Sequence, residues 1–387
     1  MLKALSIIAG LAILPAAAAA VATGSAWQID LVDQTGPGKS SSLKIDKNGN
    51  VHVAYVVDDG GTYPLKYAFW DHALKRWFVM AVAQNSGACS LALDSKQRPH
   101  ISFVDYGTAS GSKLRYAYWD GAAWQKQAIP LNSDIIAYFN SIALDANDRP
   151  SISFYEYRGP KESEIKIRLR MVTWTGEYWQ VRTIDGEEGS GKFNSMAIDA
   201  SGRIHIAYAN VSANTAGLRY ALWNGAAWKT EIVDTAPQNN GDAVGYSTCL
   251  ALDKDGDPHI AYMNESNPGL KYAVHKGGQW RIFAVERLAR IGYPDRNSIA
   301  VDENGRPYIS YYDAGRGILR LAHVSGQKWM IETVDGNGAG FTSSVAIHDG
   351  AIWISYADDA GALKVAHRAL QSDEALDASA RAREGAR

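Results

Sequence analysis

The chain has 387 residues, and its 39 basic and 41 acidic side chains give a formal net charge of −2 at pH 7. This balance excludes a general nucleic-acid-binding protein, which needs a basic stripe against the phosphate backbone. Hydrophobic residues make up 46% of the chain, and its 12 Trp and 20 Tyr favour a strand-rich fold with a large core.

The first 22 residues have the pattern of a secretory signal. Lys3 supplies a positive charge, residues 5–14 form a short apolar run, and Ala20-Val21-Ala22 has the small residues of a cleavage site. The apolar run is too short for a membrane-spanning helix. We therefore expect a mature protein that begins near residue 23, is secreted or periplasmic, and is not inserted in a membrane.

One sequence pattern then recurs seven times. Each copy contains a small polar residue with alternating apolar positions, an Asp-containing turn, an apolar strand and a basic-aromatic strand. The first six copies add a Trp after another turn. The copies start at Ser42, Ser90, Ser141, Ser195, Cys249, Ser298 and Ser344. Their spacing of 46 to 54 residues is typical of four-stranded propeller blades.

The two ends of the repeat array complement each other. The seventh copy ends at Ala369 without a Trp-bearing fourth strand, whereas residues 26–33 match residues 227–234, the fourth strand of the fourth copy. We therefore predict an all-β, seven-bladed β-propeller over residues 23–370, closed by an N-terminal strand that completes the last blade. Residues 371–387 are expected to form a flexible tail.

Residues 142–145 and 150–154, with their copies, resemble the strand pairs of bacterial BNR-repeat-like and NHL-like propellers. The resemblance covers about residues 27–369 at the level of the repeat, and the Ser-x-Asp-x-Gly-x-x-Trp box of sialidases is absent. Some BNR-like relatives are polysaccharide lyases or glycosidases, so the resemblance implies a glycan context. It assigns no catalytic residue to this chain.

The nine histidines fall mostly at repeated positions. Four of them begin second strands, at His52, His100, His205 and His259, while three lie in third strands and two in turns. None lies in the loops expected on the functional face, which join second to third and fourth to first strands. Periodic positions indicate packing, so we expect structural histidines, which counts against a histidine-dependent lyase.

Metal and disulfide chemistry is not expected. Cys89 and Cys249 lie in copies two and five, nearly across the ring, and a disulfide needs Cα atoms within about 7 Å. Asp253, Asp255 and Asp257 alternate like calcium ligands but lack a later bidentate Glu. We therefore predict two unbridged, mostly buried thiols, no metal and no cofactor.

The predicted functional face carries acids at the ends of second strands. They are Asp58, Asp105, Glu156, Asp313 and Asp358. Each is followed by Lys or Arg at the start of the third strand, so one interpretation is a structural ion pair, worth about 0–1 kcal/mol if exposed. The other is a carboxylate that binds a cation or acts on a sugar. The same axial mouth is expected to include three asparagines, Asn140, Asn194 and Asn297.

Aromatic residues precede five of the first strands, at Phe139, Phe193, Tyr246, Tyr293 and Phe341. They fit either packing between blades or stacking on sugars. The segment between copies five and six adds three arginines, Arg287, Arg290 and Arg296. Beside Tyr293 they form a candidate clamp for a carboxylate or sulfate, and a solvated charged loop is the alternative.

These features favour a monomeric, non-catalytic propeller that binds an acidic glycan or an extracytoplasmic protein. The candidate ligand-binding residues are the three arginines, Tyr293, the three asparagines, Asp58 and Asp358. The alternative is a glycosidase or polysaccharide lyase with an axial Asp/Glu–Tyr–Arg site. Its candidate catalytic residues are Glu156, Asp105, Asp313 and Tyr293.

Overall fold

The structure is a computed structural model that describes residues 26–36, 38–107, 113–132, 135–158, 166–212, 216–235, 244–265, 267–291 and 297–370. The predicted signal and C-terminal tail lie outside these residues and stay predictions. In the described ranges, no helix is long and apolar enough to cross a membrane.

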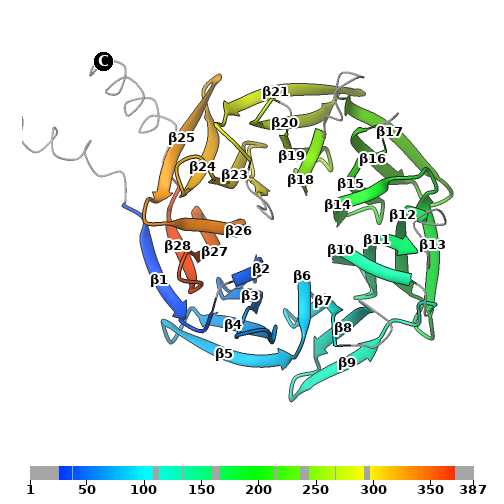
Figure 1. Cartoon of the computed structure of the whole chain (residues 1–387), viewed down its shortest axis with the longest axis horizontal. Helices are drawn as coiled ribbons and strands as arrows, with labels where there is room; N and C mark the ends of the chain where they lie inside the picture. Colours follow the sequence, from blue (N-terminus) through cyan, green and yellow to red (C-terminus); the bar gives the residue numbers. More distant parts are fainter. Residues whose placement is uncertain are drawn as a thin grey trace, which may run out of the picture.

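Seven antiparallel, four-stranded sheets form a ring around a central axis (Figure 1), which confirms the predicted propeller. Blade 1 comprises β2 (Gly38–Ile45), β3 (Val51–Val57), β4 (Leu65–Asp71) and β5 (Arg76–Ala83). Blade 2 comprises β6 (Ser86–Leu93), β7 (Pro99–Asp105), β8 (Lys113–Trp119) and β9 (Trp124–Ala128). Blade 3 comprises β10 (Ile135–Leu144), β11 (Pro150–Arg158), β12 (Lys166–Trp174) and β13 (Trp179–Asp185). Blade 4 comprises β14 (Ser190–Ile198), β15 (Ile204–Asn210), β16 (Gly217–Trp223) and β17 (Trp228–Thr235).

Blade 5 comprises β18 (Val244–Leu252), β19 (Pro258–Asn264), β20 (Gly269–Lys276) and β21 (Gln279–Arg287). Blade 6 comprises β22 (Ser298–Val301), β23 (Pro307–Asp313), β24 (Ile318–Ser325) and β25 (Lys328–Asp335). Blade 7 comprises β26 (Ala339–His348), β27 (Ala351–Asp358), β28 (Leu363–Ala369) and, from the other end of the chain, β1 (Gln28–Asp33). Strand β1 pairs with β28 from Gln28 opposite His367 to Asp33 opposite Leu363, which confirms the predicted closure.

The hydrophobic core lies between successive blades. One cluster, for example, joins Val56 and Leu65 of blade 1 to Leu91 and Ile101 of blade 2, and all four side chains are buried. Burial of each such side chain contributes about 1.5–3 kcal/mol. Each blade therefore depends on both neighbours for its stability.

The repeated serine of the sequence pattern connects the blades around the axis. Ser42 Oγ accepts a hydrogen bond from the backbone N–H of Leu91 in the next blade at 3.1 Å, and Ser90 Oγ accepts from Ile142 N–H at the same distance. The equivalent bond forms at Ser141, Ser195, Ser298 and Ser344. At the remaining position stands Cys249, whose thiol instead donates to Asn297 Oδ1 at 2.8 Å.

The repeated histidines lie on the face opposite the expected functional one and tie turns to third strands. Their Nδ1 atoms lie 2.5–2.6 Å from a Tyr hydroxyl, and their Nε2 atoms lie 3.3–3.5 Å from the carboxylate of the preceding turn. The four sets are Asp46–His52–Tyr67, Asp94–His100–Tyr116, Asp199–His205–Tyr220 and Asp253–His259–Tyr272. These contacts agree with the expected structural role.

The sequence placed the start of most first strands too late. Strands β10, β14, β18 and β26 begin five or six residues before the repeated small residue, and each contains a β-bulge. The aromatic residues expected before these strands therefore lie inside them. Phe139 and Phe193 occupy the bulges with φ of 48° and 54°, a conformation that non-glycine residues rarely adopt and that costs about 1–3 kcal/mol.

Candidate functional site

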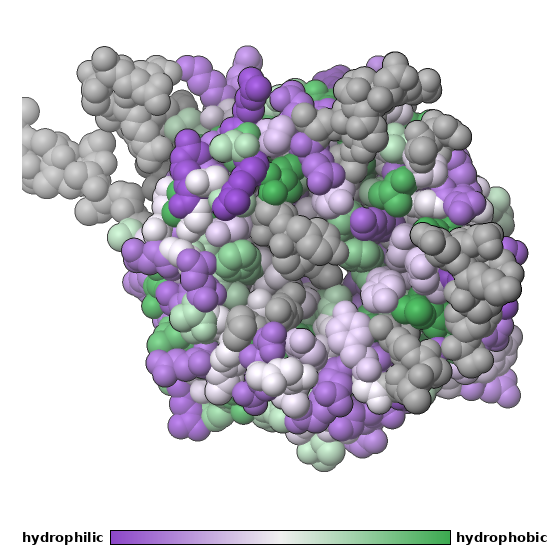
Figure 2. Space-filling model, in the orientation of Figure 1, coloured by the Kyte–Doolittle hydropathy of each residue, from purple (hydrophilic) through white to green (hydrophobic). Residues whose placement is uncertain are grey.

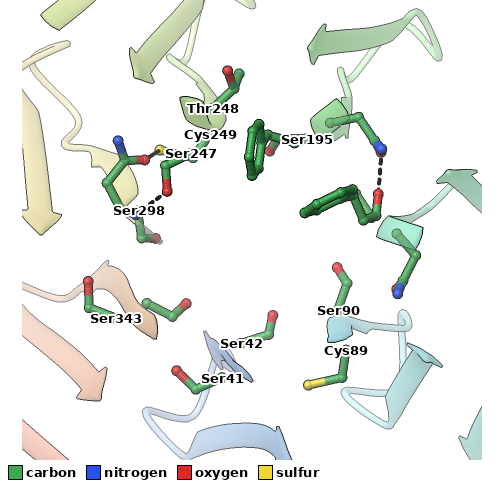
Figure 3. A pocket seen from close by; sticks show the side chains of 17 residues that line it. Ser41, Ser42, Cys89, Ser90, Ser195, Ser247, Thr248, Cys249, Ser298 and Ser343 are labelled. Atoms are coloured by element: carbon green, nitrogen blue, oxygen red, sulfur yellow. Dashed lines mark hydrogen bonds between the residues drawn. The ribbon is translucent and has the colours of Figure 1, made fainter. Parts of the chain in front are cut away.

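A cavity of about 140 Å³ opens at the axial mouth, where first strands from all seven blades converge (Figure 3). Hydroxyl, amide and thiol groups dominate its lining, together with two phenyl rings. The described lining residues are Ser41, Ser42, Cys89, Ser90, Phe139, Asn140, Ser141, Phe193, Asn194, Ser195, Ser247, Thr248, Cys249, Asn297, Ser298, Ser343 and Ser344. None of them carries a formal charge at neutral pH. In the space-filling view of this face (Figure 2), a small opening remains at the centre of the ring.

The three predicted asparagines all line this cavity. Asn140 accepts from Ser102 Oγ at 2.5 Å and donates to Ala88 O at 2.8 Å. Asn194 likewise accepts from Ser153 Oγ at 2.6 Å and donates to backbone carbonyls. Asn297 differs, because its buried Nδ2 has no hydrogen-bond partner in the described part of the chain. Hydrogen bonds within the protein therefore hold Asn140 and Asn194 in place, whereas the amide N–H groups of Asn297 are left to donate to a ligand.

Three half-buried aromatic rings form a continuous row along the mouth over blades 3 to 5. The ring centroids of Phe139 and Phe193 lie 4.7 Å apart, and those of Phe193 and Tyr246 also lie 4.7 Å apart. We call these three residues the aromatic platform. Phe341 instead packs on Tyr312 in blades 6 and 7, with centroids 4.4 Å apart, and Tyr293 lies outside the described residues.

Lys192 places a positive charge on the platform. Its Nζ lies 5.2 Å from the Phe193 ring centroid and 5.3 Å from that of Tyr246. Burial lowers the pKa of this ammonium, and the exposed Glu265 only partly opposes the shift. Sequence reasoning missed Lys192. The available signal was its position, three residues before the repeated serine, where copies three, five and seven carry Tyr138, Tyr246 and Phe341.

Four of the five predicted acids form ion pairs, Asp58 accepts from a backbone N–H while Lys66 contacts Asp33, and none of the five lines the cavity. Glu156, only 1% exposed, contacts Arg170 at 2.6 Å, and Asp313, also 1% exposed, contacts Arg316 at 2.5 Å. Asp105 pairs with Arg115 at 3.0 Å, Asp358 with Lys364 at 2.9 Å, and Asp58 accepts from Gly61 N at 3.2 Å. The geometry therefore favours the structural ion pair over a working carboxylate.

A second set of acids, at the ends of the last strands, connects each blade to the next. Asp33 accepts from Tyr55 at 2.6 Å and from Lys66 at 2.8 Å. The same Tyr–acid contact recurs as Tyr208–Asp185, Tyr262–Asp234, Tyr311–Glu286 and Tyr356–Asp335. We call this contact the inter-blade tyrosine bond. Sequence reasoning missed it, because the partners lie 21 to 28 residues apart on different blades.

The arginine segment is only partly described. Arg287 ends β21 and is exposed, and the exposed Arg290 donates through Nε to Ala314 O at 3.0 Å. Arg296 and Tyr293 lie outside the described residues. The predicted clamp therefore stays a prediction.

A larger cleft of about 300 Å³ lies between blades 4 and 5 on the opposite face. It forms where His275 occupies the position that Trp223 has in the preceding blade. Glu231 at its wall accepts from Trp280 Nε1 at 2.9 Å and pairs with Lys229 at 2.6 Å. Across the described residues, no group of three or more His, Cys, Asp or Glu side chains is placed to hold a metal.

Solved structures similar to this fold are propellers at low sequence identity. An ulvan lyase, described as a new family of polysaccharide lyase bound to -[GlcA(1-4)Rha3S]-, gives a TM-score of 0.61 at 14% identity over 90% of this chain and 98% of that one. A protein of unknown function from Dyadobacter fermentans gives 0.54 at 11% identity, with the same coverage. A Hadza microbial sialidase gives 0.52 at 11% identity over 80% of this chain and 73% of that one.

No protein-family model matches the sequence, and no curated protein matches it. The structural neighbours include polysaccharide lyases and a sialidase, which are the classes that the BNR-like resemblance implies. At these identities the likeness shows the propeller fold alone.

Proposed function

We propose that this protein is a non-catalytic, carbohydrate-binding propeller whose axial mouth holds an acidic sugar chain. The aromatic platform with Lys192 beside it carries this proposal. Aromatic faces pack on the apolar faces of sugar rings, hydroxyls and amides bond to sugar hydroxyls, and an ammonium pairs with a uronate or sulfate. The carbohydrate-active neighbours support the same ligand class.

The size of the cavity indicates how such a chain would lie. Sites for whole small-molecule ligands usually measure about 300–1,000 Å³, well above the 140 Å³ found here. The cavity therefore fits a substituent of one sugar unit, while neighbouring units lie across the platform.

We propose that the protein is not catalytic because its candidate acids are held in ion pairs. A general acid or base must exchange a proton with substrate, and Glu156, Asp105 and Asp313 each hold an Arg counter-ion. The described histidines all lie away from the axial cavity. An extracytoplasmic protein is the ligand we would consider next.

Binding of the mature protein to arrayed uronate-containing and sulfated glycans tests the proposal. Phe193→Ala should weaken binding of a positive glycan roughly tenfold, because one aromatic contact is worth about 0.5–1.5 kcal/mol. Phe283→Ala is the control, since Phe283 is 43% exposed on the outer strand β21. Failure of the wild-type protein to bind any glycan would contradict the proposal and favour a protein ligand.

A carbohydrate-active enzyme is the second candidate, because Glu156 is deeply buried directly after Tyr155, whose ring lies 5.9 Å from that of Phe139 on the platform. Turnover of uronic-acid polysaccharides by the wild-type protein, lost in a folded Glu156→Gln variant, would establish this alternative. We also infer a secreted or periplasmic location from residues 1–22. The N-terminal mass of the exported protein tests that inference, and an intact residue 1 would contradict it.

A further inference from the structure

One position of the innermost strands carries alanine in six blades and lysine in one. Two residues after the repeated small residue stand Ala92, Ala143, Ala197, Ala251, Ala300 and Ala346. Blade 1 has Lys44 there. The backbone register supports the equivalence, since Lys44 pairs with His52 as Ala92 pairs with His100. This position encircles the axis, because β2 and its counterparts are the innermost strands (Figure 1).

Two properties of Lys44 point to the channel that these strands enclose. The residue is exposed to solvent, yet the surrounding protein desolvates its ammonium and lowers its pKa. Both hold when a side chain extends into a narrow, water-filled channel. At about 3.3 Å per residue, Lys44 lies roughly 7 Å along β2 from Ser42, on the inner side of the axial cavity.

No described carboxylate compensates this charge. Burial alone accounts for the pKa shift of Lys44, without a contribution from any acid. A partly desolvated ammonium without a counter-charge is unfavourable, so an anion from solution would be stabilised beside it.

The serines around the axis supply further donors. Each Ser Oγ that accepts the N–H of the next blade still has its own hydroxyl hydrogen, because a hydroxyl is one donor and two acceptors. In the described part of the chain, Ser42, Ser90 and Ser195 donate this hydrogen to no protein atom. Figure 3 shows their oxygens around the opening.

We propose that the axial channel is an oxyanion site in which Lys44 provides the charge and the serine hydroxyls provide additional hydrogen bonds. Sulfate, phosphate and the acidic group of a sugar share the required chemistry, a compact anion with several acceptor oxygens. The serines of this site line the same axial cavity as Phe139 and Phe193 of the platform, whereas its charge comes from Lys44 and not from Lys192. Binding of a free oxyanion there does not require a glycan.

Titration calorimetry of the mature protein with sodium sulfate, at constant ionic strength, tests this site. Lys44→Ala introduces the residue of the other six blades, and Lys44→Met keeps side-chain length without charge. Both should weaken sulfate binding roughly tenfold or more, whereas Lys254→Ala, at an exposed turn of blade 5, should bind like the wild type. A wild-type protein that binds neither sulfate nor phosphate, or folded Lys44 variants that bind equally well, would overturn the proposal.

A competition experiment identifies the source of the anion. If a sulfated or uronate oligosaccharide binds the wild type and sulfate displaces it, the anion belongs to the sugar. Undiminished sugar binding in saturating sulfate, with Lys44-dependent sulfate binding, supports the channel site as one for a free oxyanion. Loss of sulfate binding in Lys192→Ala but not in Lys44→Ala would assign the anion to the rim and contradict the channel site.

Discussion

At the scale of single residues, the inter-blade tyrosine bond follows a rule inside this one chain. Five blades have a Tyr on the second strand and an acid on the preceding blade's last strand. The other two blades have Phe103 and Phe154, and the corresponding acid positions are Ala83 and Pro130. A buried hydroxyl without an acceptor costs about 1–3 kcal/mol, so the hydroxyl is present only where a carboxylate accepts its hydrogen.

We expect Tyr356→Phe to lower the free energy of unfolding by about 1–3 kcal/mol, because Asp335 loses a 2.8 Å hydrogen bond from a buried donor. The double variant Tyr356→Phe/Asp335→Ala should be more stable than the sum of the single changes predicts. It recreates the Phe–Ala combination of Phe103 and Ala83 and leaves Lys364 its contact with Asp358. Urea unfolding of the four proteins gives the coupling energy, and strict additivity would disprove the rule.

At the scale of elements, the second strands hold buried histidines that stay neutral in the folded protein. Burial is the main cause that lowers the pKa of His100, His205 and His259 below the ordinary value, and the nearby Asp only partly opposes it. The Tyr contact agrees with this state, because an unprotonated Nδ1 accepts the phenol hydrogen. Asp199 has a lowered pKa as well, because hydrogen bonds within its turn outweigh the effect of burial.

Both shifts destabilise the fold in acid. Below about pH 6.5 the unfolded chain binds protons at histidines that remain neutral when folded, and below about pH 4 it also binds them at such carboxylates. The free energy of unfolding should therefore fall from pH 7 to pH 5 by up to about 1.4 kcal/mol per pH unit for each histidine. His205→Ser, which copies Ser151 of blade 3, should reduce this slope. Urea unfolding at both pH values tests this, with the exposed His72→Ser as control, and an unchanged slope would contradict it.

At the scale of the whole molecule, strand β1 joins residues from the two ends of the chain. Besides its pairing with β28, Asp33 binds Tyr55 and Lys66 of blade 1, and Asp30 accepts from Trp77 Nε1 at 3.0 Å. Without β1, blade 7 has an unpaired edge and blade 1 loses its contacts with the neighbouring last strand.

Deletion of residues 23–33 should therefore lower the melting temperature sharply. Attaching the same segment after Leu370 should restore most of the loss, since the segment then reaches β28 from the adjacent end of the chain. Differential scanning calorimetry of the three proteins measures the effect. A deleted protein that melts like the intact one would show that ring closure is not required for stability.

The number of blades, the order of strands and the closure could be read from the sequence, because each depends on a periodic pattern. The seven copies of the pattern lack one strand at the C-terminal end and have one extra strand at the N-terminal end. A closed ring of seven four-stranded blades is the simple arrangement that explains both. The structural role of the four repeated histidines followed from the same periodicity. The acid–base pairing across single hairpins, as in Glu156 with Arg170, was predictable since the partners are only 14 residues apart.

The candidate site was decided by tertiary structure. A β-bulge changes which side chains face the axis, and the repeat pattern does not reveal that Phe139 and Phe193 lie within bulges of the first strands. The aromatic platform and the inter-blade tyrosine bonds join residues of successive blades, so they depend on how neighbouring sheets pack. The closed ring also decides whether a lysine lies on the outer surface or beside the central axis. In the sequence Lys44 looks like an ordinary exposed residue, and only the convergence of seven first strands surrounds it with protein.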